Sequence, residues 1–365
     1  MPGYIPAIGA PKSEIDTPAL LINHEVLDRN INRMAAYFKR GDVRLRPHSK
    51  THKSAAIAHK QIAAGAVGIT CAKLGEAEAM ADGGITDILI ANQIVGPIKI
   101  ARLVELAKRI RIAVAVDDPA NVRALSEAAS AAGVTLRCLV EVNIGMNRCG
   151  VEPGEPALRL AELVANSPGL TFGGIQSYEG HLVNLMPLEE RYARVRVDMQ
   201  KAVDSRRLIE QHGIPVGVVS GAGTGSFKVS MAIDGVNEIQ AGSYATMDAK
   251  YKEVGAEFDY ALTVLVTVIS RPSAEIAVVD AGLKGLTGEF GLPTVLVEGA
   301  KLMGLSEEHG KLSVSGAARD LKPGDKIEIL PSHGCTTINP YENFHVMEDD
   351  RLKEIWKIGG RGKSQ

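Results

Sequence analysis

The spacing of hydrophobic and polar positions predicts alternating strands and helices between residues 24 and 250. Short runs rich in β-branched residues predict eight strands over 43–47, 66–70, 87–91, 111–116, 136–142, 170–176, 217–220 and 237–241. Longer amphipathic stretches between them, such as 24–40, 97–109 and 119–133, predict helices. Because strands that alternate with helices pair in parallel through right-handed crossovers, eight such units favour an α/β fold of the (β/α)8 barrel type. A doubly wound open sheet is the alternative, but no dinucleotide-binding glycine fingerprint supports it.

The pattern changes after about residue 258. Strand-like runs over 261–270, 275–282, 326–331 and 343–348 follow one another through turns, with almost no helical periodicity. The segment 15–23 is also strand-like and precedes the first predicted helix, so we expect it to pair with this later region. We therefore predict two domains, a barrel over 24–257 and a mostly antiparallel β domain formed by 1–23 and 258–365.

Composition and charge narrow the class of function. The net charge of −2 gives no reason to expect a nucleic acid or an anionic membrane as partner. No apolar run approaches the roughly 18 residues of a membrane span, and the first residues lack the pattern of a secretory signal. The four cysteines are far apart in sequence, which is typical of reduced thiols rather than a disulfide framework. We expect a cytoplasmic enzyme with a small-molecule substrate.

A lysine follows the first predicted strand. Lys50 stands in the segment RLRPHSKTHK (44–53), between His48 and His52. The catalytic groups of a barrel lie at the C-terminal ends of its strands. Cationic neighbours and burial can lower the pKa of a lysine ammonium, so Lys50 is a candidate Schiff-base nucleophile. The alternative is an ordinary basic loop between a strand and a helix.

A glycine-rich segment, SGAGTGS (220–226), follows the seventh predicted strand and precedes a predicted helix. Barrels often bind a phosphate group with the loops after strands seven and eight, and the eighth strand is followed by Ser243 and Tyr244. A lysine and a phosphate cradle at the same end of a barrel together suit pyridoxal 5′-phosphate (PLP). A sugar phosphate bound through a Schiff base is the alternative ligand.

The segment PSHGCTT (331–337) is a candidate metal site. His333 and Cys335 are two positions apart, so on an extended segment both side chains would point to one face. Imidazole and thiolate are ligands of divalent metals such as Zn²⁺. A surface histidine beside a half-buried cysteine is the structural alternative.

Taken in order, the motifs resemble one family. The segments TPALLI (17–22), RPHSKTHK (46–53), NRCGV (147–151), GGIQSYEGH (173–181), SGAGTGS, QAGSYATMD (240–248) and PSHGCTT resemble the metal-activated PLP enzymes. That family includes D-threonine aldolase, 3-hydroxy-D-aspartate aldolase and eukaryotic-type D-serine dehydratase. The resemblance implies an alanine-racemase-like fold (PLP fold type III), PLP, a divalent metal (Zn²⁺, Mn²⁺ or Mg²⁺) and a homodimer.

Carried onto this sequence, the resemblance implies a role for each matching residue. Lys50 would hold PLP covalently, and His333 and Cys335 would bind the metal. The residues expected beside the cofactor ring and its phosphate are Arg148, Tyr178, Gly223, Thr224, Gly225, Ser243 and Tyr244. Lys53, Asp117 and Cys149 receive no role.

One motif departs from the aldolase pattern. The aldolase branch resembles H-x-D-P-T at the metal, whereas this chain has H-G-C-T-T, which resembles the dehydratase branch. The barrel motifs NRCGV, SGAGTGS and GSYATMD resemble the aldolases more closely, so we favour an aldolase. The thiolate makes the predicted site softer and favours Zn²⁺ over Mn²⁺ or Mg²⁺.

The resemblance therefore predicts cleavage of the Cα–Cβ bond of a D-β-hydroxy-α-amino acid such as D-threonine, giving glycine and an aldehyde. His181 or a metal-bound water is the candidate base. The alternatives are a D-serine or D-3-hydroxyaspartate dehydratase, which releases ammonia and a 2-oxo acid, and an amino-acid racemase. A non-catalytic PLP-binding protein is disfavoured, because such proteins usually consist of the barrel alone.

Overall fold

The computed structural model describes residues 4–39 and 41–365, which form two compact units. Unit 1 contains the described residues of Met1–Arg33, Thr51–Ala56 and Ser243–Gly362. Unit 2 contains the described residues of Met34–Lys50, Ile57–Gly242 and Lys363–Gln365. Residues 1–3 of the predicted segment 1–23, and residue 40 of the predicted helix 24–40, lie outside the described residues.

Unit 2 contains an eight-stranded sheet whose paired strands are all parallel. Its strands are β2 (Arg44–Leu45), β3 (Ile69–Cys71), β4 (Asp87–Gln93), β5 (Arg111–Val116), β6 (Leu136–Glu141), β7 (Leu170–Ser177), β8 (Val218–Gly221) and β9 (Glu238–Ile239). They run in the order β2-β9-β8-β7-β6-β5-β4-β3. A further bridge joins His48, just after β2, to Thr70 in β3, and the Val67 N–H donates to the Leu45 carbonyl. These links join the two edges of the sheet and close it into a barrel.

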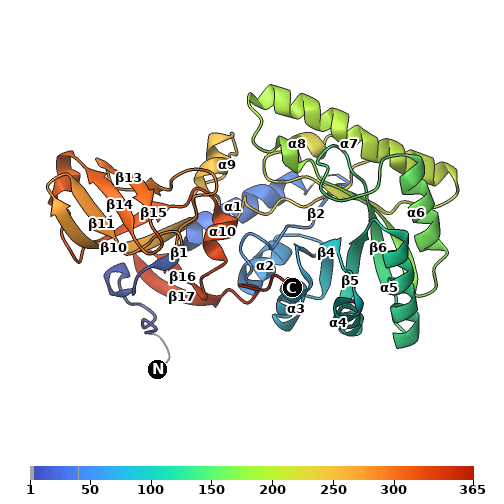
Figure 1. Cartoon of the computed structure of the whole chain (residues 1–365), viewed down its shortest axis with the longest axis horizontal. Helices are drawn as coiled ribbons and strands as arrows, with labels where there is room; N and C mark the ends of the chain where they lie inside the picture. Colours follow the sequence, from blue (N-terminus) through green and yellow to red (C-terminus); the bar gives the residue numbers. More distant parts are fainter. Residues whose placement is uncertain (1–3, 40) are drawn as a thin grey trace. The chain divides into compact units, whose positions relative to one another are not determined.

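Helices fill the connections between the barrel strands. They are α2 (Ala55–Ala63), α3 (Leu74–Asp82), α4 (Pro97–Ala107), α5 (Pro119–Ala132), α6 (Glu155–Ala165), α7 (Leu188–Gln211) and α8 (Phe227–Ser230). Helices α4, α5 and α6 lie on the outside of the strands (Figure 1). The boundaries of α5 follow from its sequence, because the Asp118 carboxylate accepts from Asn121 N–H at the start and Gly133 adopts φ 65° at the end.

Side chains on β6 show how the barrel interior is filled. Arg137, Leu139 and Glu141 alternate with outward positions, so they share the inward face from the N-terminal to the C-terminal end of the strand. Leu139 packs with Leu89 and Ala113 in a small apolar layer. The interior is therefore apolar only in part.

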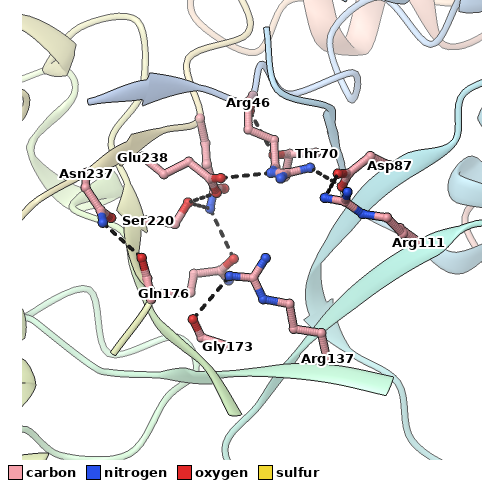
Figure 2. Close-up of polar contacts among 12 residues, drawn as sticks. Arg46, Thr70, Asp87, Arg111, Arg137, Gly173, Gln176, Ser220, Asn237 and Glu238 are labelled. Carbon is pink, nitrogen blue, oxygen red and sulfur yellow. Dashed lines mark hydrogen bonds and ion pairs between the residues drawn. The ribbon is translucent and has the colours of Figure 1, made fainter. Parts of the chain in front are cut away.

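A chain of hydrogen bonds runs through the rest of the barrel interior, and part of it is drawn in Figure 2. From the C-terminal to the N-terminal end its members are Gln93, Glu141, Gln176, Gln240, Ser220, Glu238, Arg46 and Asp87. Buried polar groups need partners, and here each side chain satisfies the next.

Unit 1 is built on a nine-stranded, mostly antiparallel sheet. Its strands are β1 (Ala19–Asn23), β10 (Leu262–Ser273), β11 (Ile276–Val279), β12 (Thr294–Val295), β13 (Ala300–Leu305), β14 (Gly310–Val314), β15 (Lys326–Leu330), β16 (Asn343–Glu348) and β17 (Arg351–Lys357). Strand β1 pairs antiparallel with β10 and parallel with β16. Two short helices, α9 (Ala249–Glu253) and α10 (Gly334–Ile338), also belong to unit 1, and α1 (His24–Tyr37) has residues in both units.

The predicted fold class, a (β/α)8 barrel with a mostly antiparallel β domain, is confirmed. The sequence pattern did not predict β12, β13, β14 or β17. Among the residues that the structure describes, no helix is both long enough and apolar enough to cross a membrane.

Candidate active site

Two of the predicted site residues of unit 2, Lys50 and Arg148, lie over the aromatic ring of a third, Tyr178. Lys50 follows β2, and its Nζ lies 5.6 Å from the centroid of the Tyr178 ring. The Arg148 guanidinium lies 5.7 Å from the same centroid. Tyr178 directly follows β7, so the ring stands at the C-terminal end of the barrel strands. Two cations within about 6 Å of one ring form favourable cation–π contacts and fix the position of the lysine.

The glycine-rich loop after β8 reaches the same ring. A Cβ on Gly223 would lie 3.4 Å from the Tyr178 hydroxyl oxygen, so the loop backbone passes close to the phenol. The Gly223 N–H donates to the Ser226 hydroxyl, and Thr224 is buried. Ala222 has φ 65°, which turns the chain out of the strand. A close-packed glycine loop beside a lysine and an arginine fits a phosphate-bearing aldehyde such as PLP.

A buried carboxyl group lies beneath this loop. Glu179 is fully buried, and the Ser230 hydroxyl donates to its Oε1 at 3.4 Å. Burial raises the pKa of Glu179, and hydrogen bonds from Ser226 and other neighbours only partly offset that effect. The sequence analysis did not select Glu179, because Tyr178 and His181 in the same segment, SYEGH, were the candidate site residues.

Glu141 is a second residue that the sequence did not single out. Its Oε1 lies 3.9 Å from Nη2 of Arg148, and its Oε2 accepts from Gln93 at 2.7 Å. Burial raises the pKa of Glu141, while the Gln93 hydrogen bond and Arg148 act against the rise. Asp117 accepts from the Gly150 N–H at 2.9 Å and so holds the loop that carries Arg148. Glu141 and Asp117 together position the arginine.

His181 is held by a carboxylate on the neighbouring helix. It lies in a short 3-10 turn, Gly180–Leu182, after β7, and its Nε2 is 2.9 Å from Oδ2 of Asp198 in α7. Asp198 also accepts from Lys201 at 2.8 Å. An imidazole whose one nitrogen is engaged by a carboxylate has a fixed ring orientation and presents its other nitrogen, Nδ1, for proton transfer.

The predicted metal ligands of unit 1 lie at the start of α10. His333 is the residue before the helix, and Cys335 lies in its first turn, so the expected extended segment is wrong. The reason is local: the Gly334 N–H donates to the Asp248 carboxylate at 2.9 Å, and the Thr337 hydroxyl donates to the His333 carbonyl at 2.9 Å. Capping of this kind stabilises a helical turn.

Asp248 also fixes the histidine. His333 Nδ1 lies 3.0 Å from Asp248 Oδ2, so Nδ1 keeps its proton when the ring is neutral, and the lone pair is then on Nε2. Burial opposes protonation, but hydrogen bonds with Asp248 and Cys335 outweigh it and raise the pKa of His333 to about 10. The Cys335 thiol contacts the Thr51 hydroxyl at 3.3 Å. Imidazole nitrogen and thiol sulfur side by side are a donor set that suits Zn²⁺.

The structure adds no third ligand of the usual kinds. Within residues 4–39 and 41–365, no group of three or more His, Cys, Asp or Glu side chains is arranged to hold a metal. Any site built on His333 and Cys335 thus has to be completed by substrate or water, as in open catalytic centres.

Ser243 and Tyr244 also belong to unit 1. The Ser243 hydroxyl lies 3.4 Å from that of Thr51, the residue after Lys50 in the chain. Tyr244 is fully buried and packs on Phe258, with ring centroids 5.4 Å apart.

Comparison with known proteins decides the family. Residues 22–250 match the family described as alanine racemase, N-terminal domain, and residues 261–347 match the "Putative serine dehydratase domain". A D-threonine aldolase from Arthrobacter sp. is 38% identical over 98% of this chain and 96% of its own length. The chain belongs to the family of D-threonine aldolases, 3-hydroxy-D-aspartate aldolases and D-serine dehydratases. Members of this family are lyases, and so is this chain.

Solved structures of the lyase family share the whole fold. The crystal structure of D-threonine aldolase from Filomicrobium marinum is 42% identical, covers 99% of both chains and superposes with a TM-score of 0.96. A D-threo-3-hydroxyaspartate dehydratase, solved as a cysteine-to-alanine mutant in the metal-free form, is 29% identical with a TM-score of 0.87, over 95% of this chain and 98% of that one. The chain is thus similar to both branches, with the higher identity on the aldolase side.

Proposed function

We propose that this lyase cleaves the Cα–Cβ bond of D-β-hydroxy-α-amino acids, such as D-threonine, to glycine and an aldehyde, with PLP and a divalent metal. The observation that carries the proposal is the position of Lys50 against the Tyr178 ring, whose hydroxyl lies beside Gly223 of the glycine-rich loop. The similarity to D-threonine aldolases supports the substrate class.

In this proposal PLP supplies an electron sink for the pair released at Cα. Lys50 holds the cofactor covalently and Tyr178 packs beside it. Arg148 contributes a positive charge that Glu141 and Asp117 keep in place. The residues proposed to bind the phosphate are Gly223, Thr224, Gly225, Ser243 and Tyr244.

The metal would supply Lewis-acid polarisation of the substrate hydroxyl. His333 and Cys335 are the proposed ligands, and Asp248 orients the imidazole through Nδ1. The similar dehydratase solved as a cysteine-to-alanine mutant in the metal-free form supports a role for a cysteine at such a centre.

His181 is the proposed base. Because Asp198 engages Nε2 at 2.9 Å, the proton of the substrate hydroxyl would pass to Nδ1. The same carboxylate stabilises the imidazolium that results, without itself taking the proton.

Dehydration of the same substrates, with release of ammonia and a 2-oxo acid, is the second candidate. The observation in its favour is Cys335 in place of the aspartate typical of the aldolase motif. In this version the Lys50 amine would take up the α-proton of the substrate.

Product analysis tests the two functions. The purified chain, supplied with PLP and Zn²⁺, Mn²⁺ or Mg²⁺, is incubated with D-threonine, L-threonine and D-3-hydroxyaspartate. We expect glycine from the D-substrates and none from L-threonine. Ammonia with 2-oxo acid in place of glycine would establish the dehydratase, and L-amino acid formed from a D-substrate would establish a racemase. Lys50→Ala is expected to lose PLP absorbance after desalting, whereas Lys53→Ala, the matched control, retains it.

We also propose that the chain works as a homodimer in the cytoplasm, in line with the family resemblance. Size-exclusion chromatography with light scattering measures the mass in solution and so tests whether the chain is a homodimer.

A further inference from the structure

A cavity of about 270 Å³ lies at the N-terminal end of the barrel strands, the end opposite to Tyr178 and the glycine-rich loop. Its charged side chains are Arg46, Asp87, Arg111, Arg137 and Glu238. Its apolar walls include Leu89, Ala113, Leu139 and Val218, the layer that closes the barrel interior. Figure 2 shows the charged group and the contacts among its members.

Two of the three arginines are fully matched by carboxylates. Arg46 is buried, with a side chain only 7% exposed, and it lies 2.7 Å from Asp87 Oδ1 and 3.0 Å from Glu238 Oε2. Arg111 pairs with the other Asp87 oxygen, and the Ser220 hydroxyl donates to the other Glu238 oxygen. All four carboxylate oxygens are therefore engaged, and two positive charges balance two negative ones.

Arg137 is the third arginine, and it forms no direct ion pair: Glu238 and Asp87 attract it only at longer range. Its Nη2 donates to the Gly173 carbonyl at 3.3 Å, and no carboxylate of the described residues lies within ion-pair distance. The side chain is half-buried. Burial lowers the pKa of Arg137; attraction by Glu238 and Asp87 opposes this effect, and repulsion by Arg46 and Arg111 adds to it. A guanidinium has five N–H donors, so most of those on Arg137 have no protein acceptor. A partly desolvated cation that shares its nearest carboxylates with Arg46 and Arg111 is stabilised by a further anion beside it.

Glycines make the room in which the Arg137 side chain lies. A Cβ on Gly173 would come within 2.5 Å of Arg137 Nε, and a Cβ on Gly217 would lie 3.7 Å from its Nη2. The guanidinium therefore lies against bare backbone on one side. Figure 2 shows the guanidinium below Arg46 and Glu238, which also line the cavity.

We propose that this cavity is a binding site for a small monocarboxylic acid, separate from the proposed catalytic residues. The ligand carboxylate pairs with the Arg137 guanidinium through two parallel N–H···O bonds, the geometry that guanidinium and carboxylate favour. Its short hydrocarbon part packs on Leu89, Ala113 and Leu139. The volume of about 270 Å³ is close to the lower end of the range for small-molecule sites, so a ligand of this size fits within it.

A binding role and a purely structural role make opposite predictions for stability. An arginine that holds the fold together destabilises the chain when it is removed. An unpaired, half-buried arginine kept for a ligand is itself unfavourable, so its replacement by an apolar side chain of similar length is neutral or stabilising. Arg137→Met should therefore leave the melting temperature unchanged or raise it.

The binding experiment uses isobutyrate as the probe and isothermal titration calorimetry as the measurement. We expect isobutyrate to bind the wild-type chain and to bind Arg137→Met at least about tenfold more weakly. Arg123→Met, which removes an exposed arginine of α5 outside the cavity, is the matched control and should bind as the wild type does. Equal binding by wild type and Arg137→Met, or no binding by the wild type, would overturn the proposal. Inorganic phosphate is the second probe, and tighter binding of phosphate than of isobutyrate would overturn the carboxylic-acid assignment.

A crystal of the wild-type chain soaked in isobutyrate gives an answer that does not depend on how the variant folds. Density for the carboxylate within hydrogen-bond distance of the Arg137 guanidinium supports the site. Isobutyrate bound only elsewhere, or a lowered melting temperature in Arg137→Met together with unchanged isobutyrate affinity, assigns the arginine to the fold instead.

Discussion

Asp248 and His333 form a hydrogen-bonded pair across 85 positions of the chain, with Oδ2 3.0 Å from Nδ1. The same oxygen accepts from the Gly334 N–H. One carboxylate therefore orients the His333 ring and stabilises the first turn of the helix that carries Cys335. A residue that fixes a ligand in this way has a measurable effect on metal affinity even though it does not bind the metal.

Asp248→Asn should weaken metal binding by about 10–100-fold, the range found when the partner of a ligating histidine is removed. The physical reason is that an amide can present either its carbonyl or its NH₂ group to Nδ1, so it favours the tautomer with the lone pair on Nε2 less strongly than an ionised carboxylate does. Competition of the apoprotein with a chromogenic zinc indicator measures the affinity. Asp259→Asn, at a half-exposed carboxylate of the same unit, is the control, and an affinity that drops equally in both variants would contradict the role of Asp248.

Cys335 is expected to decide which metal is preferred. Replacement of a soft thiolate by a carboxylate in Cys335→Asp should lower the ratio of Zn²⁺ to Mn²⁺ bound by on the order of tenfold. Equilibrium dialysis against both metals, followed by elemental analysis, gives the ratio. Cys149→Ser removes the other half-buried cysteine and should leave the ratio as it is. A ratio that does not respond to Cys335→Asp would remove this residue from the proposed centre.

Glu179 should make the chain less stable as the pH rises. Its pKa in the folded state is raised above 4.5, so its contribution is fully present below pH 4.5 and is lost as the pH rises through the folded-state pKa. The amide side chain in Glu179→Gln does not titrate, so this loss of stability is absent from the variant. The urea midpoint of this variant should therefore exceed that of the wild type by an amount that grows from pH 4.5 to pH 8. Glu127→Gln, at an exposed position, should show a constant difference, and a constant difference for Glu179→Gln would mean that the carboxyl is not held protonated.

Arg46 should be important for stability, in contrast to Arg137. Arg46→Leu leaves Glu238 buried without its cation and Asp87 with only the exposed Arg111, which should cost about 3–5 kcal/mol. Urea unfolding followed by circular dichroism measures the loss. Arg123→Leu, on the surface of α5, should change the unfolding free energy by less than about 0.5 kcal/mol.

The barrel could be predicted from the sequence because most of its strands lie in short apolar runs followed by amphipathic helices. The same regularity placed Lys50 and the glycine-rich loop at strand ends, where the structure has them. Strands β13 and β14 were missed because both are short, Gly304 interrupts β13 and Gly310 begins β14, and such runs resemble loops.

The parts of the site that the sequence did not predict depend on partners far away in the chain. The helical turn at His333 is induced by Asp248, and no local pattern at 331–337 reveals that carboxylate. In the run LRCLVEV, nothing distinguishes Glu141 from an ordinary polar residue near the end of a strand. Its inward direction became meaningful only once Gln93 and Gln176, from two other strands, were seen to donate to it.

The hydrogen-bond chain inside the barrel has a direction. Glu141 can only accept while ionised, so the Gln176 amide must turn its NH₂ group toward it and its carbonyl toward Gln240. Gln240 in turn donates to Ser220, which donates to Glu238. A single replacement anywhere along this line would leave a neighbouring donor without an acceptor, or a neighbouring acceptor without a donor. The interior positions are thus expected to vary together among descendants of this chain, as a set, rather than one at a time.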